Sequence, residues 1–309
     1  MTDRQRAGRE TGDRSSTGGA GHIALVLLLG VLWGFNWPAV KISLGEIAPW
    51  TLRTIGMLFG GLMLAGIALV RGRKLTIPRE HWLRLAVGGI LSIAAFNILL
   101  AFAQLSAVTS RAAIVTYTMP IWATVFARIV LGEKFDRRRI LGLALAVAGL
   151  AALGLPLLET GRLQIGLLYA LGGGISWAAG TVVTKRYPVA APPLTIATWQ
   201  LLIGAGSAAI GMLTFEGLPI PKPLAPETWA ALLYHILLAQ GLAYFLWFEV
   251  LARIPVGIAS IGTLLVPPFG VLGAVIFVGD RPTTADGIGL ILVVAAAAAV
   301  LLPSRAKPV

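Results

Sequence analysis

Several polar and aromatic side chains stand inside long apolar stretches of this 309-residue chain. Amide and hydroxyl groups there would orient a small molecule through hydrogen bonds, and aromatic rings would pack against its apolar part. Trp33 and Asn36 are three residues apart, so they share one face of a helix. Gln240 and Tyr244 are four residues apart and share another. We expect such faces to form one mostly apolar binding site, with the candidates Trp33, Asn36, Asn97, Tyr117, Trp177, Gln240 and Tyr244.

The sequence offers few residues of the types that catalyse reactions. The chain has no cysteine, which excludes a thiolate nucleophile and Cys-ligated metal centres. Glu249 is the only acidic residue well inside an apolar stretch, and His235 has no evident serine partner. No glycine-rich loop of the ATP-binding type occurs. We expect no catalytic residue, no metal site and no bound cofactor, and an intramembrane enzyme is a distant alternative.

The apolar stretches themselves set the fold class. Hydrophobic residues make up 57% of the chain and charged residues 12%, and the mean hydropathy is +0.85. About 20 apolar residues cross a bilayer as a helix, so the sequence predicts an integral, all-α membrane protein. Continuous rather than alternating apolar runs exclude a transmembrane β-barrel. Ten spans are expected, at about 22–43, 49–70, 82–104, 111–131, 137–156, 164–185, 193–215, 228–251, 257–279 and 284–302.

These spans fall into two repeats. The recurring pairs are Trp33/Trp177, Lys41/Lys185, Pro49/Pro193 and Thr51/Thr195 at one spacing of 144 residues, and Pro120/Pro267, Gly132/Gly279, Glu133/Asp280 and Gly142/Gly289 at another of 147. Five helices per repeat is an odd number, so the second repeat must enter the membrane inverted. We expect a disordered tail at 1–21, repeats at 22–156 and 157–303 around a central cavity, and a second tail at 304–309.

The net charge of +12 marks one side of the membrane and does not indicate nucleic-acid binding. With ten spans, most of the 25 Lys and Arg fall on the side of the N-terminus, which predicts an inner (plasma) membrane protein with both termini in the cytoplasm. Arg53 and Arg111 lie near outer helix ends, where we expect them to snorkel towards the headgroups. Glu249 is expected to pair with Arg253, one helical turn on.

The repeat also carries motifs of a known group. Trp33, Gly34 and Asn36, the Leu-Gly-Glu-Lys run at 131–134 and its echo Val-Gly-Asp-Arg at 278–281 resemble EamA domains of the drug/metabolite transporter superfamily. The resemblance covers roughly residues 22 to 303 and points to the YddG-like bacterial amino-acid exporters. It implies a basket of ten helices around a central cavity. Asp280 departs from the family's usual glutamate, and we expect its loop to be structural.

Alternating access is the mechanism that inverted repeats predict. We expect a secondary transporter that exports small metabolites, above all aromatic and other neutral amino acids, with broad specificity. Its partners would be this small-molecule substrate and the lipid bilayer, while the oligomeric state and the coupling ion stay open. A multidrug or other metabolite permease is the alternative within the same superfamily.

Two prolines at equivalent depth suggest where such a protein bends. Pro120 and Pro267 each remove one intrahelical hydrogen bond, which tends to kink a helix. Because they are related by the repeat, bending at both would open one end while closing the other. We expect Pro120 and Pro267 to act as hinges.

Overall fold

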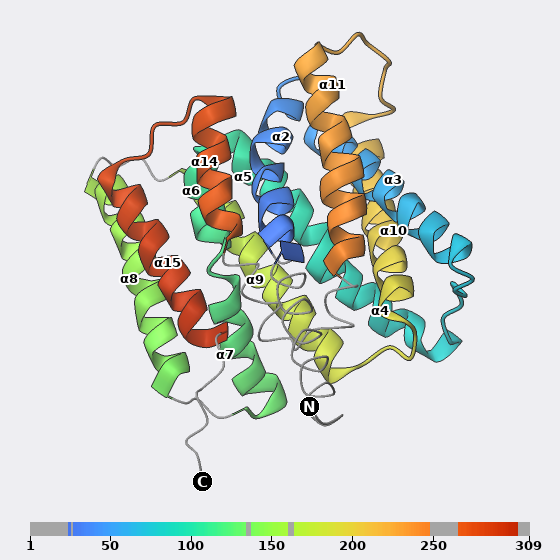
Figure 1. Cartoon of the computed structure of the whole chain (residues 1–309), viewed down its shortest axis with the longest axis horizontal. Helices are drawn as coiled ribbons and strands as arrows, with labels where there is room; N and C mark the ends of the chain where they lie inside the picture. The colour runs from blue at the N-terminus through green and yellow to red at the C-terminus, as the bar shows by residue number, and fades with distance from the viewer. Residues whose placement is uncertain (1–23, 26, 134–136, 160–163, 248–264, 302–309) are drawn as a thin grey trace, which may run out of the picture.

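The computed structural model describes residues 24–25, 27–133, 137–159, 164–247 and 265–301, and every regular element among them is helical (Figure 1). Six helical stretches are long and apolar enough to cross a membrane: Pro49–Val70, Arg79–Ser106, Thr109–Leu131, Ile165–Arg186, Pro193–Glu216 and Pro226–Trp247. Shorter apolar helices cover Ile140–Leu153, Val266–Val278 and Thr284–Ala299. These are the features of a multi-pass membrane protein.

The elements follow one another closely along the chain. The first half contains α2 (Asn36–Ser43), α3 (Pro49–Val70), η1 (Arg79–His81), α4 (Trp82–Gly89), η2 (Ile90–Ala95), α5 (Phe96–Ser106), α6 (Thr109–Thr116), α7 (Met119–Leu131) and α8 (Arg137–Glu159). The second half contains α9 (Ile165–Arg186), α10 (Pro193–Gly211), η3 (Met212–Glu216), α11 (Pro226–Leu233), η4 (Tyr234–Leu242), α14 (Val266–Val278) and α15 (Thr284–Leu301).

Repeated residues begin and end equivalent helices. Pro49 and Pro193 each stand in the first turn of α3 and α10, where a proline needs no N–H partner. The helices α7 and α14 both have 13 residues and a proline in the first turn. Both end at a glycine in the left-handed conformation, Gly132 with φ of 71° and Gly279 with φ of 75°, which only glycine adopts without strain. Local structure therefore follows the sequence repeat.

The equivalent helices α3 and α10 pack side by side in antiparallel directions. Gly61 of α3 lies against Leu202, and Gly204 of α10 lies against Met57. The residue number therefore increases along one helix in the direction in which it decreases along the other. At one end of the pair, Glu216 accepts hydrogen bonds from the backbone N–H groups of Trp50 and Thr51, both 2.8 Å long. Small residues at the crossing let the two backbones approach closely.

The helices α8 and α15 form a second antiparallel pair at the opposite edge of the molecule (Figure 1). Gly149 of α8 lies against Leu292 and Val293, whereas Gly289 of α15 lies against Leu153. This pair too joins helices that the 147-residue repeat makes equivalent. In both pairs the two equivalent helices run in opposite directions.

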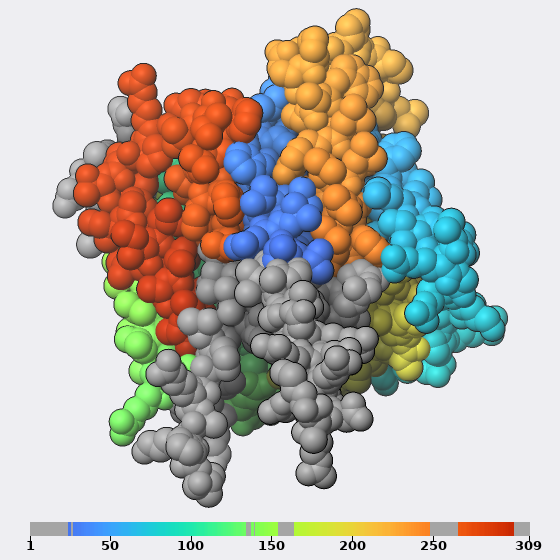
Figure 2. All heavy atoms as spheres, in the orientation of Figure 1, coloured from blue at the N-terminus to red at the C-terminus, as the bar shows by residue number. Residues whose placement is uncertain are grey.

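Two of the expected spans are interrupted rather than continuous. The span Thr109–Leu131 breaks between α6 and α7, because Pro120 has no N–H to bond the carbonyl of Thr116. Likewise, the first span turns at Phe35, ahead of Pro38 in α2. The segments η2 and η4 are π-helical and lie at matching places in the two halves. In Figure 2, α2 of the first half lies between α11 and α14 of the second.

Candidate functional site

A polar cluster joins four helical elements of the two halves, α2, α3, α5 and η4. Asn97 of α5 accepts hydrogen bonds at Oδ1 from Nη1 of Arg53 on α3, at 3.3 Å, and from Nε2 of Gln240 on η4, at 3.4 Å. The amide of Asn97 also donates from Nδ2 to the carbonyl of Ile93, at 2.9 Å. All three side chains are buried, with Arg53 only 2% exposed. We call Arg53, Asn97, Gln240, His235 and Asn36 the polar cluster.

The second part of the polar cluster is a contact between η4 and α2. Nδ1 of His235 and Oδ1 of Asn36 are 2.8 Å apart, and His235 is fully buried. The opposite edge of the ring, at Nε2 and Cδ2, meets α3 at Gly56, where a Cβ atom would collide with the imidazole. Gly60, one turn further, meets Gln240 in the same way. Glycines on this face of α3 therefore bring η4 close enough for the polar side chains to meet.

The aromatic candidates of the first and eighth expected spans also meet. The rings of Trp33 and Tyr244 are 5.7 Å apart in an edge arrangement, and Trp247 lies at the same distance from Trp33. The indole N–H of Trp33 donates to the carbonyl of Ala239, at 3.2 Å. Edge-to-face pairs of this kind fix ring orientation and leave ring faces for other contacts. The structure thus brings Trp33 and Tyr244 together with the segment that carries Gln240.

Two other predicted site residues do not contact the polar cluster through any hydrogen bond between described residues. Tyr117 stands at the break between α6 and α7 and packs on the same apolar cluster as Trp33. Trp177, on α9, is half-buried, and no contact recorded among the described residues joins it to the polar cluster. The buried prolines Pro120 and Pro267 begin α7 and α14, directly after the turns that precede them.

The expected snorkelling of two arginines is wrong. Arg53 turns inward to Asn97, and Arg111 forms an ion pair with Asp286 of α15. Arg111 is half-buried because the carboxylate of Asp286 compensates its charge. Arg53 is buried with a hydrogen bond to the amide oxygen of Asn97 on α5. The expected pairing of Glu249 with Arg253 lies outside the described residues.

His235 and Arg53 belong to the cluster although neither is among the predicted site residues. Arg53, Gly56 and Gly60 occur at positions i, i+3 and i+7, so they share one helix face. A charged residue on the same face as two glycines is a signal that the face is packed against protein, not lipid. His235 is five residues before Gln240 on a π-helical turn, a spacing that an ordinary helix would not place on one face.

The two ends of the molecule carry equivalent charged residues in different arrangements. At one end, Nζ of Lys185 lies 2.6 Å from Oε1 of Glu133. Their repeat equivalents at the other end are Lys41 and Asp280. Nζ of Lys41 donates to the carbonyl of Gln104, at 2.5 Å, and Oδ2 of Asp280 accepts the N–H of Ser110 at the start of α6, at 2.8 Å. Asp280 thus caps a helix, in agreement with the structural role expected of its loop.

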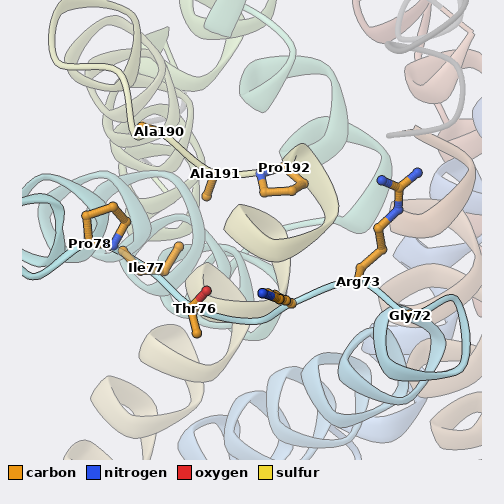
Figure 3. A pocket seen from close by; sticks show the side chains of 9 residues that line it. Gly72, Arg73, Thr76, Ile77, Pro78, Ala190, Ala191 and Pro192 are labelled. Atoms are coloured by element: carbon orange, nitrogen blue, oxygen red, sulfur yellow. The ribbon is translucent and has the colours of Figure 1, made fainter.

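Two hollows lined by described residues lie near these ends. One of about 420 Å³ is lined by Lys41, Asp280, Gln164 and residues 105–109. The other, of about 560 Å³, lies between the loop 72–78 and the segment 190–192 (Figure 3). Neither hollow is lined by a member of the polar cluster.

Known proteins are similar to this chain in both sequence and fold. A model of the EamA-like transporter family matches residues 21–155 and 164–302. The "Uncharacterized transporter YvbV" of Bacillus subtilis is 28% identical over 92% of each chain. The "Probable amino-acid metabolite efflux pump" of Salmonella typhimurium is 26% identical over 88% of this chain and 91% of its own, and its Escherichia coli namesake 23% over 87% and 91%. A crystal structure with 22% identity covers 93% of this chain and 99% of its own with a TM-score of 0.66, which shows a shared fold.

Proposed function

Since this membrane protein belongs to the EamA-like transporter family, we propose that it exports small metabolites, above all amino acids, by alternating access. It would be a secondary transporter of the inner membrane with both termini in the cytoplasm, and not an enzyme. Aromatic and other neutral amino acids are the expected substrates. A multidrug permease of the same family is the alternative that the experiment below separates from it.

The observation that carries this proposal is the antiparallel packing of equivalent helices. The pairs α3/α10 and α8/α15 each cross so that one repeat runs opposite to the other. Such packing supports ten transmembrane helices arranged as two inverted repeats, the plan in which two halves exchange conformations around a shared site. The prolines that begin α7 and α14 lie at matching depth, which supports hinges at Pro120 and Pro267.

The charged residues at the two ends could stabilise two alternating conformations of the protein. The pair Glu133–Lys185 joins the two halves at the cytoplasmic end of the proposed topology. The equivalent Asp280 and Lys41 both line a hollow at the opposite end and are not ion-paired with each other. In the opposite conformation the repeat would exchange these roles, so that Lys41 approaches Asp280 while Lys185 separates from Glu133. One end is then closed whenever the other is open.

The proposed site combines the aromatic pair Trp33 and Tyr244 with polar groups of both halves. Indole and phenol rings would pack the side chain of an amino acid, and could add a cation–π contact for its ammonium group. Asn36, Asn97 and Gln240 would supply hydrogen bonds. Tyr117 and Trp177 would line other parts of the path. Relatives described as amino-acid metabolite efflux pumps support this substrate class.

Transport in proteoliposomes tests the proposal. Purified protein should move radiolabelled phenylalanine or another neutral amino acid, with and without an imposed pH gradient. Trp33→Ala and Tyr244→Ala should fold but lose most of this transport, while Trp229→Ala, an exposed indole on α11, should not. Failure of every amino acid together with movement of a cationic dye would favour the multidrug permease.

A further inference from the structure

Arg53 is a buried cation with a neutral partner. Arg53 is 2% exposed, and its guanidinium donates to the amide oxygen of Asn97. Its Nε has no hydrogen-bond partner within the part of the chain that the structure describes. No carboxylate of the described residues lies within ion-pairing distance of it. Burying a charge without a counter-charge costs stability, so a buried arginine of this kind points to a functional role.

Arg111 shows what a structural arginine looks like in the same protein. Its Nε lies 2.5 Å from Oδ1 of Asp286, and its Nη2 lies 3.3 Å from Oδ2, so the carboxylate meets the guanidinium fork with both oxygens. This is the arrangement that compensates a buried arginine charge. Arg53 has the same fork, but among the described residues only its Nη1 has a hydrogen-bond partner, the neutral amide oxygen of Asn97. Its fork can therefore receive a carboxylate.

The hydrogen-bond chain around Asn97 also fixes the polarity of its neighbours. Its Nδ2 must face the carbonyl of Ile93, which only accepts, so Oδ1 faces Arg53 and Gln240. Gln240 must therefore present Nε2 to that oxygen, which leaves its own Oε1 as an acceptor. This Oε1 is buried and has no hydrogen-bond partner among the described residues. A cationic donor and an acceptor, each without such a partner, thus lie beside the same amide oxygen.

We propose that Arg53 and Gln240 form the recognition site for the two charged ends of a zwitterionic substrate. Arg53 binds the carboxylate through Nε and a second guanidinium nitrogen, and Oε1 of Gln240 accepts a hydrogen bond from the ammonium group. Asn97 accepts a hydrogen bond from each of these two side chains in the structure, and it is displaced from Arg53 when substrate enters. The site selects molecules that carry both charges, and it disfavours lipophilic cations because Arg53 repels them.

This inference rests on the proposed function, since it requires that amino acids be transported. The probes are radiolabelled phenylalanine and two competitors in proteoliposomes: phenylalaninamide, which lacks the carboxylate, and 3-phenylpropanoate, which lacks the ammonium group. Wild-type protein should prefer unlabelled phenylalanine over each competitor by at least about tenfold, as the loss of one charge-assisted hydrogen bond implies. Arg53→Met should lose the preference over phenylalaninamide. Gln240→Leu should lose most of the preference over 3-phenylpropanoate.

Controls separate recognition from folding. Arg84→Gln removes an exposed charge of α4 and should behave as wild type. The thermal unfolding temperature of Arg53→Met should equal or exceed that of wild type, because removing a buried charge that lacks an acidic partner does not destabilise a protein. A variant that fails to fold, or a double variant Arg53→Met/Glu249→Gln that regains full transport and preference, would show an internal ion pair and overturn the proposal.

The outcomes also separate this site from the wider function. If wild-type protein moves no amino acid, the proposed function fails. If it moves phenylalanine and Arg53→Met keeps the same preference over phenylalaninamide, the proposed function stands and the recognition site is wrong.

Discussion

Among the residues that the structure describes, two ion pairs join the halves of this transporter, and they differ in burial. Arg111 and Asp286 connect α6 with α15, with side chains 17% and 3% exposed. Lys185 and Glu133 connect the end of α9 with the residue after the α7 cap, with side chains 65% and 26% exposed. A buried pair is expensive to break because it leaves an uncompensated charge, whereas an exposed pair can exchange its partner for water. Only the exposed pair is suited to opening in every transport cycle.

The largest effect is expected at the buried pair. Asp286→Asn leaves Arg111 without its counter-charge, and weakens the hydrogen bonds that Oδ2 accepts from the N–H and hydroxyl of Thr283. Breaking a buried pair from one side costs about 3–5 kcal/mol. Thermal unfolding in detergent should show a large drop in the unfolding temperature, partly recovered in Arg111→Gln/Asp286→Asn. An unchanged unfolding temperature would mean that this pair does not hold the halves together.

A smaller effect on stability, but a clear effect on transport, is expected at the exposed pair. Lys185→Glu places like charges side by side, which replaces an attraction of about 0.5 kcal/mol by a similar repulsion. A change of about 1 kcal/mol shifts the balance between the two conformations roughly fivefold and lowers the transport rate. Exchanging the charges in Glu133→Lys/Lys185→Glu should restore transport, while Arg84→Glu serves as the exposed control. A swap that restores nothing would count against an ionic gate.

The smallest effect is expected at a third contact between the halves, an exposed one. The pKa of Glu46 lies below its ordinary value of 4.5, because the Thr228 side chain and the N–H of Ala225 hydrogen-bond its carboxylate. A lowered folded-state pKa stabilises the protein above pH 4.5, and this contribution is lost as the pH falls through the folded-state value. Unfolding temperatures below pH 4.5 should therefore decline slightly more in wild type than in Glu46→Gln. Parallel curves would show that the contact is not coupled to folding.

Sequence alone predicted the local elements of this fold well. The span 49–70 appears as α3 with the same bounds, because Pro49 can begin a helix and the apolar run ends at Arg71. Gly132 and Gly279 end α7 and α14, as their repeated position implies. Hydrophobic periodicity and the effects of proline act within a few residues, so they can be recognised in a single sequence. The turns before Pro120 and Pro267 follow from the same rule, while their role as hinges stays a prediction.

Long-range partners were harder to predict. Arg53 lies four residues inside a helix end, where a lone arginine in a membrane protein usually snorkels. Its inward orientation depends on Asn97, 44 residues away, and on the glycines that admit η4. His235 joins the cluster only because η4 is π-helical, which propensity does not indicate. The places of Arg53 and His235 depend on another helix and were not predicted, whereas the helix starts and ends set by Pro49, Gly132 and Gly279 were.

The central claim, that one end closes as the other opens, is tested most directly by paired distances in the cysteine-free chain. Spin labels at Ile129→Cys and Arg186→Cys would report on the Glu133–Lys185 end, and labels at Leu105→Cys and Arg281→Cys on the Lys41–Asp280 end, all of which are exposed positions. When a transported amino acid is added, double electron–electron resonance should show the first distance lengthening while the second shortens. Both distances changing in the same direction, or neither changing, would contradict alternating access by two inverted repeats.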